Sequence, residues 1–289
     1  MHALTRRQFS AAALSALCAL TGLTGCTDIG TSGTAHGSGS APLKTPAPDS
    51  DTLRIGVRSG IVGFGYLNEQ TNKYYGMEID LANDLVNRLG YKGAEFVTVT
   101  PDNRKEMLLE GKVDALIACY SIADSRLENF DFSPAYYDDE VIAVVQDSSL
   151  VNSIYGLKGL TFGTMSGSNA APLLSIKLYD MHFSDGEVRK ANEDNSDVTF
   201  DTWRLLQFPS YQELSDALEA GIIDAMVLDG AIAKSYMNDE RSKLNGFVVA
   251  EQSYGIATPK GSVLSDRVAD VVQEMLDDGT IDTLIDKWD

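Results

Sequence analysis

The chain has 289 residues, of which 44% are hydrophobic and 22% are charged, a composition typical of a folded globular protein. Its 42 acidic and 23 basic side chains give a net charge of −19 at pH 7. Such a surface repels phosphate backbones, so nucleic acid is not an expected partner. The composition also excludes a mainly disordered chain, a disulfide scaffold and a polytopic membrane protein.

The N-terminus has the three parts of an export signal. Arg6 and Arg7 precede an apolar run over residues 9–23, which is too short and too rich in Ala, Ser and Gly for a membrane span. Residues 5–9 also resemble a twin-arginine motif, so that both Sec and Tat export remain open.

Leu23-Thr24-Gly25-Cys26 resembles the lipobox of bacterial lipoproteins, which is cleaved before a cysteine that receives lipid. This implies a signal peptide over residues 1–25 and lipidation of Cys26. The alternative is a buried N-terminal helix with an incidental cysteine. On the lipoprotein interpretation, the mature protein is extracytoplasmic and is anchored to the cell membrane by lipidated Cys26.

Residues 26–52 predict a flexible linker. They are rich in Gly, Ser, Thr and Pro, and as a coil they would span roughly 30 Å. After cleavage only Cys26 and Cys119 would remain, so no intramolecular disulfide is expected. Cys119 ends an apolar strand pattern and is interpreted as a small buried hydrophobic residue.

Apolar runs alternate with helical periodicity from residue 53 onward, which predicts an α/β fold. Residues 53–57 and 115–119 predict strands. Residues 78–89 predict an amphipathic helix that stops at a glycine, and residues 101–111 predict a second helix with Thr100 as its N-cap.

One pattern occurs twice. Residues 109–117 and 219–227 share the order helix end, Gly, tight turn, Asp and buried strand. Ser210 and Glu213 form a capping box before the second copy. Two copies 110 residues apart suggest two similar lobes, although helix–Gly–strand also recurs by chance. Residues 263–288 predict two closing helices.

Common catalytic and metal-binding patterns are absent from the sequence. Histidine occurs only at positions 2, 36 and 182, and the chain contains no CxxC, HxxxH, GxSxG or P-loop pattern. We therefore expect no metal, no cofactor and no enzymatic activity.

Residues 121–126 and 130–137 together are similar to the signature of extracytoplasmic amino-acid-binding proteins of ABC importers, solute-binding protein family 3. Further matches are found in the segments 76–81, 109–114, 157–159, 254–257 and 286–288. The resemblance covers the chain from about residue 53 to its end. The least typical stretch is 176–203, which is longer and more polar than usual.

The resemblance implies a two-lobed periplasmic-binding-protein-like fold of type II, with two crossover strands as the hinge. Lobe 1 would comprise residues 53–144 and 255–289, and lobe 2 residues 145–254. It also implies a monomer whose partners are a small-molecule amino acid, an ABC permease and, through the lipid anchor, the membrane.

Two charged residues match the family's ligand-binding positions. Arg126 matches the arginine that binds the α-carboxylate, and a planar guanidinium suits bidentate recognition. Asp229 matches the acid that binds the ammonium group. The alternatives are a surface salt bridge for Arg126 and a helix N-cap for Asp229. Ser121 keeps a hydroxyl of the motif, whereas Ala123 loses one.

Four more residues fill the expected pocket. Ser166 and Ser168 match a Ser-Gly-Thr turn at the start of a helix in lobe 2. Phe64 and Tyr66 follow the first strand, where the family places aromatic residues against the ligand; core packing is the alternative explanation.

Arg58 and Arg104 indicate the ligand class. The family position of Arg58 contacts the ligand's side chain, and Asn103-Arg104 resembles a pair in glutamate/aspartate binders. Together with Arg126, three cations would surround one cleft in an acidic protein, which favours a dicarboxylate. The alternative is that Arg58 pairs with Glu78 or Asp80.

The sequence therefore predicts a substrate-binding lipoprotein that captures L-glutamate or L-aspartate for an ABC transporter. Glutamine, another polar amino acid or an organic acid is the nearest alternative. A dehydratase on this fold and a sensory or adhesion module are the more distant ones.

Overall fold

The computed structural model describes residues 51–289. The predicted signal peptide, Cys26 and all but the last two residues of the predicted linker lie outside this range. Within it, no helix is both long enough and apolar enough to cross a membrane.

The first lobe is built on a five-stranded sheet of order β5-β1-β6-β15-β7. Its strands are β1 (Thr52–Val57), β5 (Gly93–Thr98), β6 (Ala115–Ile117), β7 (Phe130–Phe132) and β15 (Ala257–Pro259). Its helices are α1 (Met77–Arg88), α2 (Arg104–Leu109), α3 (Asp124–Leu127), α7 (Val263–Asp277) and α8 (Thr280–Trp288). A small sheet of β2 (Gly60–Ile61), β3 (Gly65–Asn68) and β4 (Lys73–Tyr75) follows β1.

The second lobe is built on a seven-stranded sheet of order β10-β11-β12-β9-β13-β8-β14. Its strands are β8 (Tyr137–Gln146), β9 (Thr161–Met165), β10 (Lys190–Ala191), β11 (Asp197–Thr199), β12 (Arg204–Phe208), β13 (Ala225–Asp229) and β14 (Arg241–Tyr254). Its α-helices are α4 (Ala170–Asp180), α5 (Tyr211–Glu219) and α6 (Gly230–Ala233). The atypical polar stretch contributes β10 and β11, which extend this sheet at one edge.

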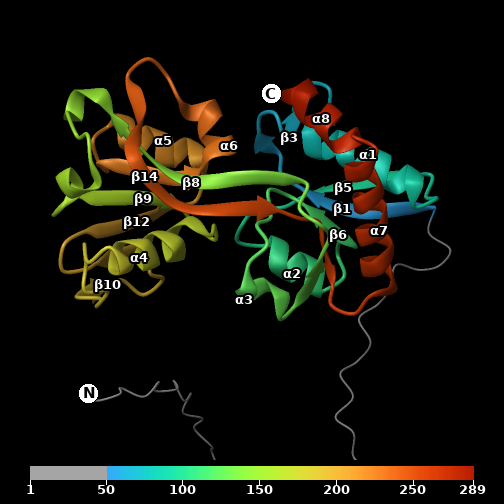
Figure 1. Cartoon of the computed structure of the whole chain (residues 1–289), viewed down its shortest axis with the longest axis horizontal. Coiled ribbons are helices and arrows are strands. Elements are labelled where there is room, and N and C mark those ends of the chain that lie inside the picture. The colour runs from blue at the N-terminus through green and yellow to red at the C-terminus, as the bar shows by residue number, and fades with distance from the viewer. Residues whose placement is uncertain (1–50) are drawn as a thin grey trace, which may run out of the picture. The chain divides into compact units, whose positions relative to one another are not determined.

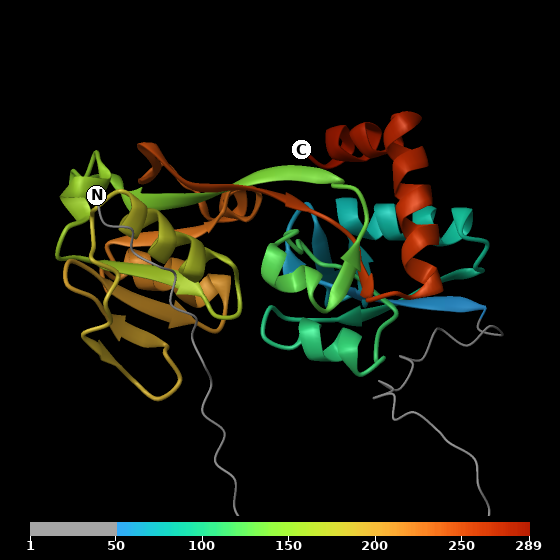
Figure 2. The same ribbon diagram turned by 60° about the horizontal axis from the view of Figure 1, so that its bottom comes forward.

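Two long antiparallel strands connect the lobes. β8 and β14 pair from Tyr137 opposite Tyr254 to Gln146 opposite Arg241. Figures 1 and 2 show these strands side by side between the two groups of elements. Tyr254 also bridges to Ser121 beyond β6 of the first lobe. This arrangement agrees with the expected two-lobed α/β fold with two crossover strands.

The sequence repeat corresponds to a structural repeat. Asp114 accepts the backbone N–H of Arg54 at 2.9 Å, and Asp224 accepts that of Thr161 at 2.8 Å. In return, the backbone N–H of Asp114 donates to the carbonyl of Arg54, and that of Asp224 donates to the carbonyl of Thr161. Each aspartate therefore fastens the start of a buried strand to its parallel neighbour.

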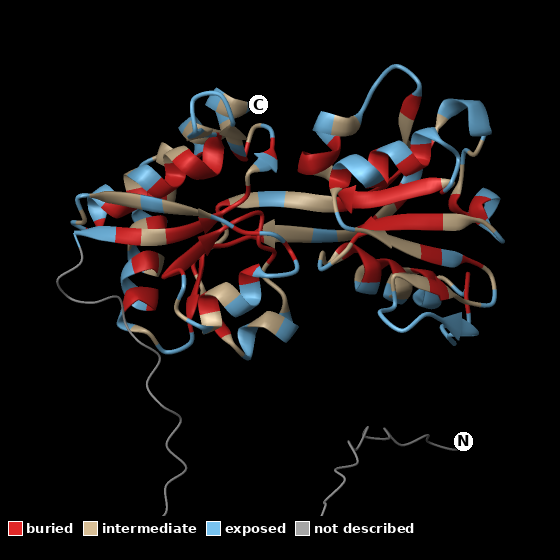
Figure 3. Ribbon diagram, turned by 180° about the vertical axis from the view of Figure 1, so that it is seen from behind, coloured by how far each residue is buried: buried red, intermediate tan, exposed pale blue. Residues whose placement is uncertain are grey.

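The hydrophobic core lies along the sheets, whose central strands are buried while the outer faces of the helices are exposed (Figure 3). β6 and β13 are buried along their whole lengths. Both strands are covered on both faces, which agrees with their apolar sequences, continuous in β6 and up to Leu228 in β13.

Two local expectations were wrong. The second helix begins at Arg104, since the side chain of Asn103 accepts the N–H of Thr100 and closes a turn over residues 100–103. The strand predicted to end at Cys119 stops at Ile117, and Cys119 has φ +46°. Cys119 is nevertheless buried, as expected.

Candidate functional site

Two arginines of the first lobe contact the ring of Tyr120. The guanidinium carbon of Arg104 lies 4.3 Å from the ring centroid and that of Arg126 lies 4.1 Å from it. Arg104 also donates to the carbonyl of Ala118 at 2.9 Å, and Arg126 to that of Ser121 at 2.6 Å. The ring and the carbonyls fix both cations while leaving other N–H groups of each available.

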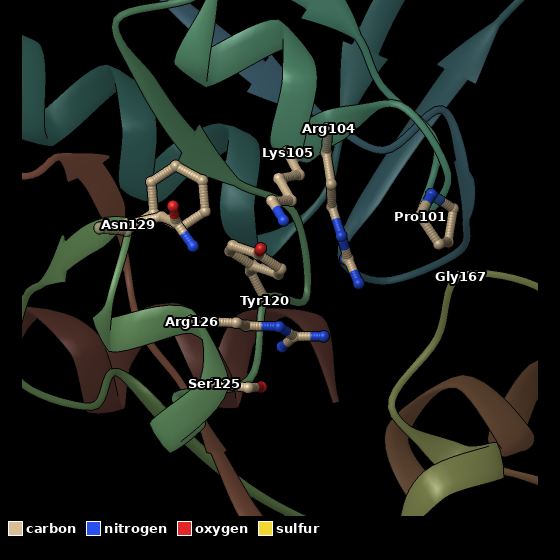
Figure 4. Close-up of a pocket in the computed structure, with 9 residues that line it drawn as sticks. Pro101, Arg104, Lys105, Tyr120, Ser125, Arg126, Asn129 and Gly167 are labelled. Atoms are coloured by element: carbon tan, nitrogen blue, oxygen red, sulfur yellow. The ribbon is translucent and has the colours of Figure 1, made fainter. Parts of the chain in front are cut away.

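A pocket of about 250 Å³ opens beside these arginines. Figure 4 shows Arg104 and Arg126 extending toward the loop of the second lobe that carries Gly167. The lining residues are Pro101, Arg104, Lys105, Tyr120, Ser125, Arg126, Asn129, Phe130 and Gly167. Neither Arg58 nor Asp229 lines this pocket. The charges of both nevertheless act on Arg104, which does line it.

Arg58 follows β1 and is only 7% exposed. Its guanidinium carbon lies 5.8 Å from the ring centroid of Tyr211 in the second lobe, so the two lobes meet here. In residues 51–289, no salt bridge joins Arg58 to Glu78 or Asp80. Asp80 instead binds Lys287 and the indole of Trp288.

Glu78 is a fully buried carboxylate close to this site. Its Oε1 accepts the N–H of Cys119 at 2.6 Å and the hydroxyl of Tyr136 at 2.5 Å. Burial raises the pKa of Glu78, and these two hydrogen bonds and the charge of Arg58 partly oppose the shift. Arg58 therefore acts on Glu78 through its field rather than through a salt bridge.

The three arginines belong to one electrostatic cluster. Burial, together with the charge of Arg58, lowers the pKa of Arg104. Burial and the charge of Arg104 lower the pKa of Arg126 to about 10. Such repulsion between neighbouring cations, of which Arg58 and Arg104 are buried, is relieved by a bound anion.

Asp229 ends β13 and is 7% exposed. It accepts the hydroxyl of Tyr254 at 2.7 Å. Burial raises its pKa, while Tyr254, Gln252 and the charges of Arg104 and Arg126 lower it. The structure therefore places Asp229 within electrostatic reach of two of the predicted arginines. Its side chain does not cap α6, contrary to the N-cap alternative.

The predicted serines make different contacts. Ser121 donates to Gln252 of β14 at 2.8 Å. The hydroxyl oxygen of Ser166, in the second lobe, lies 3.1 Å from Oδ1 of Asp102 in the first lobe. The hydroxyl of Ser168 instead donates to the carbonyl of Met165, three residues earlier in the same turn, at 2.7 Å. Ser121 and Ser166 thus lie at junctions between the lobes and Ser168 stabilises a turn.

The two predicted aromatic residues differ in burial. Phe64 is 7% exposed and packs edge-on against Tyr137 at 4.9 Å between centroids, within the hydrophobic core. Tyr66 lies in β3, where it pairs with Tyr75, and is 41% exposed. The core-packing alternative therefore describes Phe64, and no contact in the described residues brings Tyr66 to the arginines.

Sequence reasoning missed several polar and aromatic residues of the site: Glu78, Tyr120, Asp139, Tyr211, Gln252 and Tyr254. Tyr120 directly precedes Ser121, and Tyr211 directly follows the N-cap Ser210, so adjacency to known motifs was an available signal. Asp139 lies on β8 and Gln252 on β14, and no local sequence pattern distinguishes either of them as a site residue. Among residues 51–289, no cluster of His, Cys, Asp and Glu could hold a metal ion.

Residues 53–289 match the family described as bacterial extracellular solute-binding proteins, family 3. The chain is 27% identical over 264 residues to the ABC transporter glutamine-binding protein GlnH of Bacillus subtilis, covering 90% of this chain and 89% of that protein. It is 24% identical over 255 residues to the glutamate-binding protein GluB of Corynebacterium glutamicum, covering 83% and 79%.

A solved structure extends the comparison to the fold. The ancestral amino acid-binding protein AncCDT-1, a precursor of cyclohexadienyl dehydratase, matches with a TM-score of 0.66 at 25% identity, covering 82% of this chain and 95% of that one. The expected type II fold is thereby confirmed. The chain belongs to the bacterial extracellular solute-binding proteins of family 3.

Proposed function

We propose that this protein captures an acidic amino acid, L-glutamate or L-aspartate, and delivers it to an ABC permease. The observation that carries the proposal is the arginine cluster: the charge of Arg58 acts on Arg104 and that of Arg104 on Arg126, and none of the three has a salt-bridge partner within residues 51–289. Leaving a buried cation unpaired is costly, and a ligand with two carboxylates would remove most of that cost.

Each ligand group has a matching partner. Arg126 would bind the α-carboxylate and Asp229 the ammonium group, with Arg58 and Arg104 facing the side-chain carboxylate. Glutamine has one carboxylate fewer and would leave a guanidinium opposite a neutral amide. Because one relative is named a glutamine-binding protein, glutamine is the competing ligand that an experiment must separate from glutamate.

Contacts across the lobes support capture by closure about β8 and β14. Arg58 approaches Tyr211, and Ser166 approaches Asp102, from opposite lobes. Ligand would bind between the open lobes, and closure would bury it. We assign residues 53–144 and 255–289 to lobe 1 and residues 145–254 to lobe 2.

We also propose that the protein is exported with a cleaved signal peptide, anchored outside the membrane by lipidated Cys26, monomeric and not an enzyme. Cys26→Ser should release the protein from the membrane fraction. Retention of that variant in the membrane would contradict lipidation at Cys26.

A thermal-shift screen tests the ligand class, since a ligand that binds only the folded state raises its melting temperature. We expect stabilisation by glutamate or aspartate and none by cationic amino acids. Arg126→Ala should abolish the shift, because losing one partner of a buried charge pair costs about 3–5 kcal/mol. An unchanged shift in Arg126→Ala would overturn the carboxylate assignment.

A further inference from the structure

The hydroxyl of Tyr254 contacts two carboxyl groups at once. Its oxygen lies 2.7 Å from Oδ2 of Asp139 and 2.7 Å from Oδ2 of Asp229. A phenol carries one hydrogen and an ionised carboxylate carries none, so Tyr254 alone can supply a hydrogen for only one of these contacts. A second contact this short between oxygens requires a proton on one carboxyl group.

The three groups come from three neighbouring strands. Asp139 lies on β8, Tyr254 on β14 and Asp229 at the end of β13. Asp139 is held by a second bond, because its Oδ1 accepts the N–H of Ala231 at 3.1 Å. Tyr254 is fully buried and Asp229 nearly so, so water does not readily replace the contact between them, whereas Asp139 is partly exposed.

The surroundings contain charges of both signs. Burial raises the pKa of Asp139, and the charge of Asp229 raises it further, while Tyr254 and two backbone N–H groups lower it. The titratable and charged groups facing Asp229 are Arg104, Arg126, Cys119, Tyr211, Tyr254 and Asp139. Those facing Asp139 are Tyr254, Asp229, Tyr137 and Lys234.

We propose that Asp139, Tyr254 and Asp229 together hold one proton beyond the phenol's own in the ligand-free cleft, and that the ligand's ammonium group displaces it. Asp139 and Tyr254 are then positioning residues for the ammonium site. This inference rests on the proposed function, in which Asp229 binds that ammonium group.

The proton balance is simple. Before binding, a carboxylic acid of the pair donates to one side of the Tyr254 oxygen, and Tyr254 donates to the other carboxylate. On binding, the ligand keeps its ammonium protons and donates to Asp229, Tyr254 donates to Asp139, and the carboxylic proton passes to the buffer. Ligand binding therefore releases up to one proton, and affinity falls as the solution becomes more acidic.

Titration calorimetry in two buffers with different ionisation heats measures this proton. The titrations use L-glutamate at pH values above the titration range of its carboxyl groups, so that the ligand itself exchanges no proton. We expect the observed heat to depend on the buffer, with release approaching one proton per ligand at the acidic end. An anionic ligand near Glu78 would instead favour proton uptake there, which has the opposite sign.

Asp139→Asn tests the assignment to these residues. Its amide oxygen can accept the N–H of Ala231 while its NH₂ donates to Tyr254, whose hydrogen then always points to Asp229. Proton release should fall to near zero and the dependence of Kd on pH should flatten. Asp138→Asn is the matched control, since Asp138 is exposed, accepts the Ser253 hydroxyl at 2.7 Å between the same two strands and lies outside the proposed triad.

The outcomes separate the two proposals. Binding of glutamate with heats that do not depend on the buffer at any pH overturns the inference and leaves the proposed function standing. Equal effects of Asp139→Asn and Asp138→Asn overturn the role of Asp139. Absence of binding by any amino acid removes the proposed function and this inference with it. The wild-type titration decides the proton release even where a variant does not fold.

Discussion

Ser166 of the second lobe and Asp102 of the first lobe meet across the cleft, with 3.1 Å between Oγ and Oδ1. The next residue, Gly167, lines the same pocket as Arg104 and Arg126. The turn at residues 166–167 therefore contacts the first lobe and also covers the pocket beside the two arginines.

Gly167→Ala should block this approach. Gly167 has φ +67°, and an added Cβ would lie 2.8 Å from the carbonyl carbon of Pro101 and 2.9 Å from the N of Asp102, both backbone atoms. We expect at least a tenfold loss of ligand affinity by calorimetry and a smaller ligand-induced compaction in X-ray scattering.

Gly221→Ala is its matched control. Gly221 has the same φ of +67°, but an added Cβ there meets nothing within 4 Å. Both variants carry the backbone penalty of about 1–2 kcal/mol, and only Gly167→Ala should weaken binding. Equal affinities of the two variants would argue against a role for the turn at Gly167 in closure.

Arg58→Gln should change specificity. Removing one partner of a buried charge pair costs about 2–5 kcal/mol, or about thirtyfold or more in Kd. We expect that loss for glutamate and a much smaller change for glutamine, measured by calorimetry. Arg88→Gln, which removes surface contacts to Asp84 and Asp278, should leave both affinities unchanged. Equal losses of affinity for glutamate and glutamine in Arg58→Gln would show that Arg58 does not distinguish the side chains of the two ligands.

The two repeated aspartates should differ in their contributions to stability. Asp114 is buried and binds both the backbone and the guanidinium of Arg54, whereas Asp224 binds the N–H of Thr161. Asp114→Ala should lower the free energy of unfolding by about 1–3 kcal/mol, and Asp224→Ala by less. Denaturant unfolding measures both, and a larger cost at Asp224 would contradict the importance of the Arg54 contacts.

Glu78→Gln should stabilise the protein more at neutral than at mildly acidic pH. Because burial raises the folded-state pKa of Glu78 above its unfolded value, its contribution to stability is present at low pH and is lost as the pH rises through that folded pKa. Glutamine keeps an acceptor for Cys119 and Tyr136 without the charge. A difference in melting temperature between Glu78→Gln and the wild type that does not vary with pH would contradict the raised pKa of Glu78.

Strong local patterns predicted much of the fold. Ser210 caps α5 as expected, with its hydroxyl accepting the N–H of Glu213 at 3.1 Å. The start of α2 was misplaced because Thr100 and Asn103 can each end a turn or cap a helix, and the choice depends on the contact that Asn103 makes in three dimensions.

The site was less predictable than the fold. Motif positions predicted Arg126 and Asp229 as site residues, but not that two guanidinium groups contact the ring of Tyr120 or that the Tyr254 hydroxyl contacts two carboxyl groups. Asp139, Asp229 and Tyr254 lie on three strands far apart in the chain, so no local pattern marks their contacts. Ser168 has a hydroxyl at the predicted position, but this hydroxyl donates to the carbonyl of Met165 in the same turn.

The central claim is that the arginine cluster selects a dicarboxylate. The most direct test is titration calorimetry of protein that has been unfolded and refolded to remove bound ligand, with L-glutamate, L-aspartate and L-glutamine in parallel. The account predicts tight binding of an acidic amino acid and much weaker binding of glutamine. Tight binding of glutamine with silence from both acidic amino acids would contradict it.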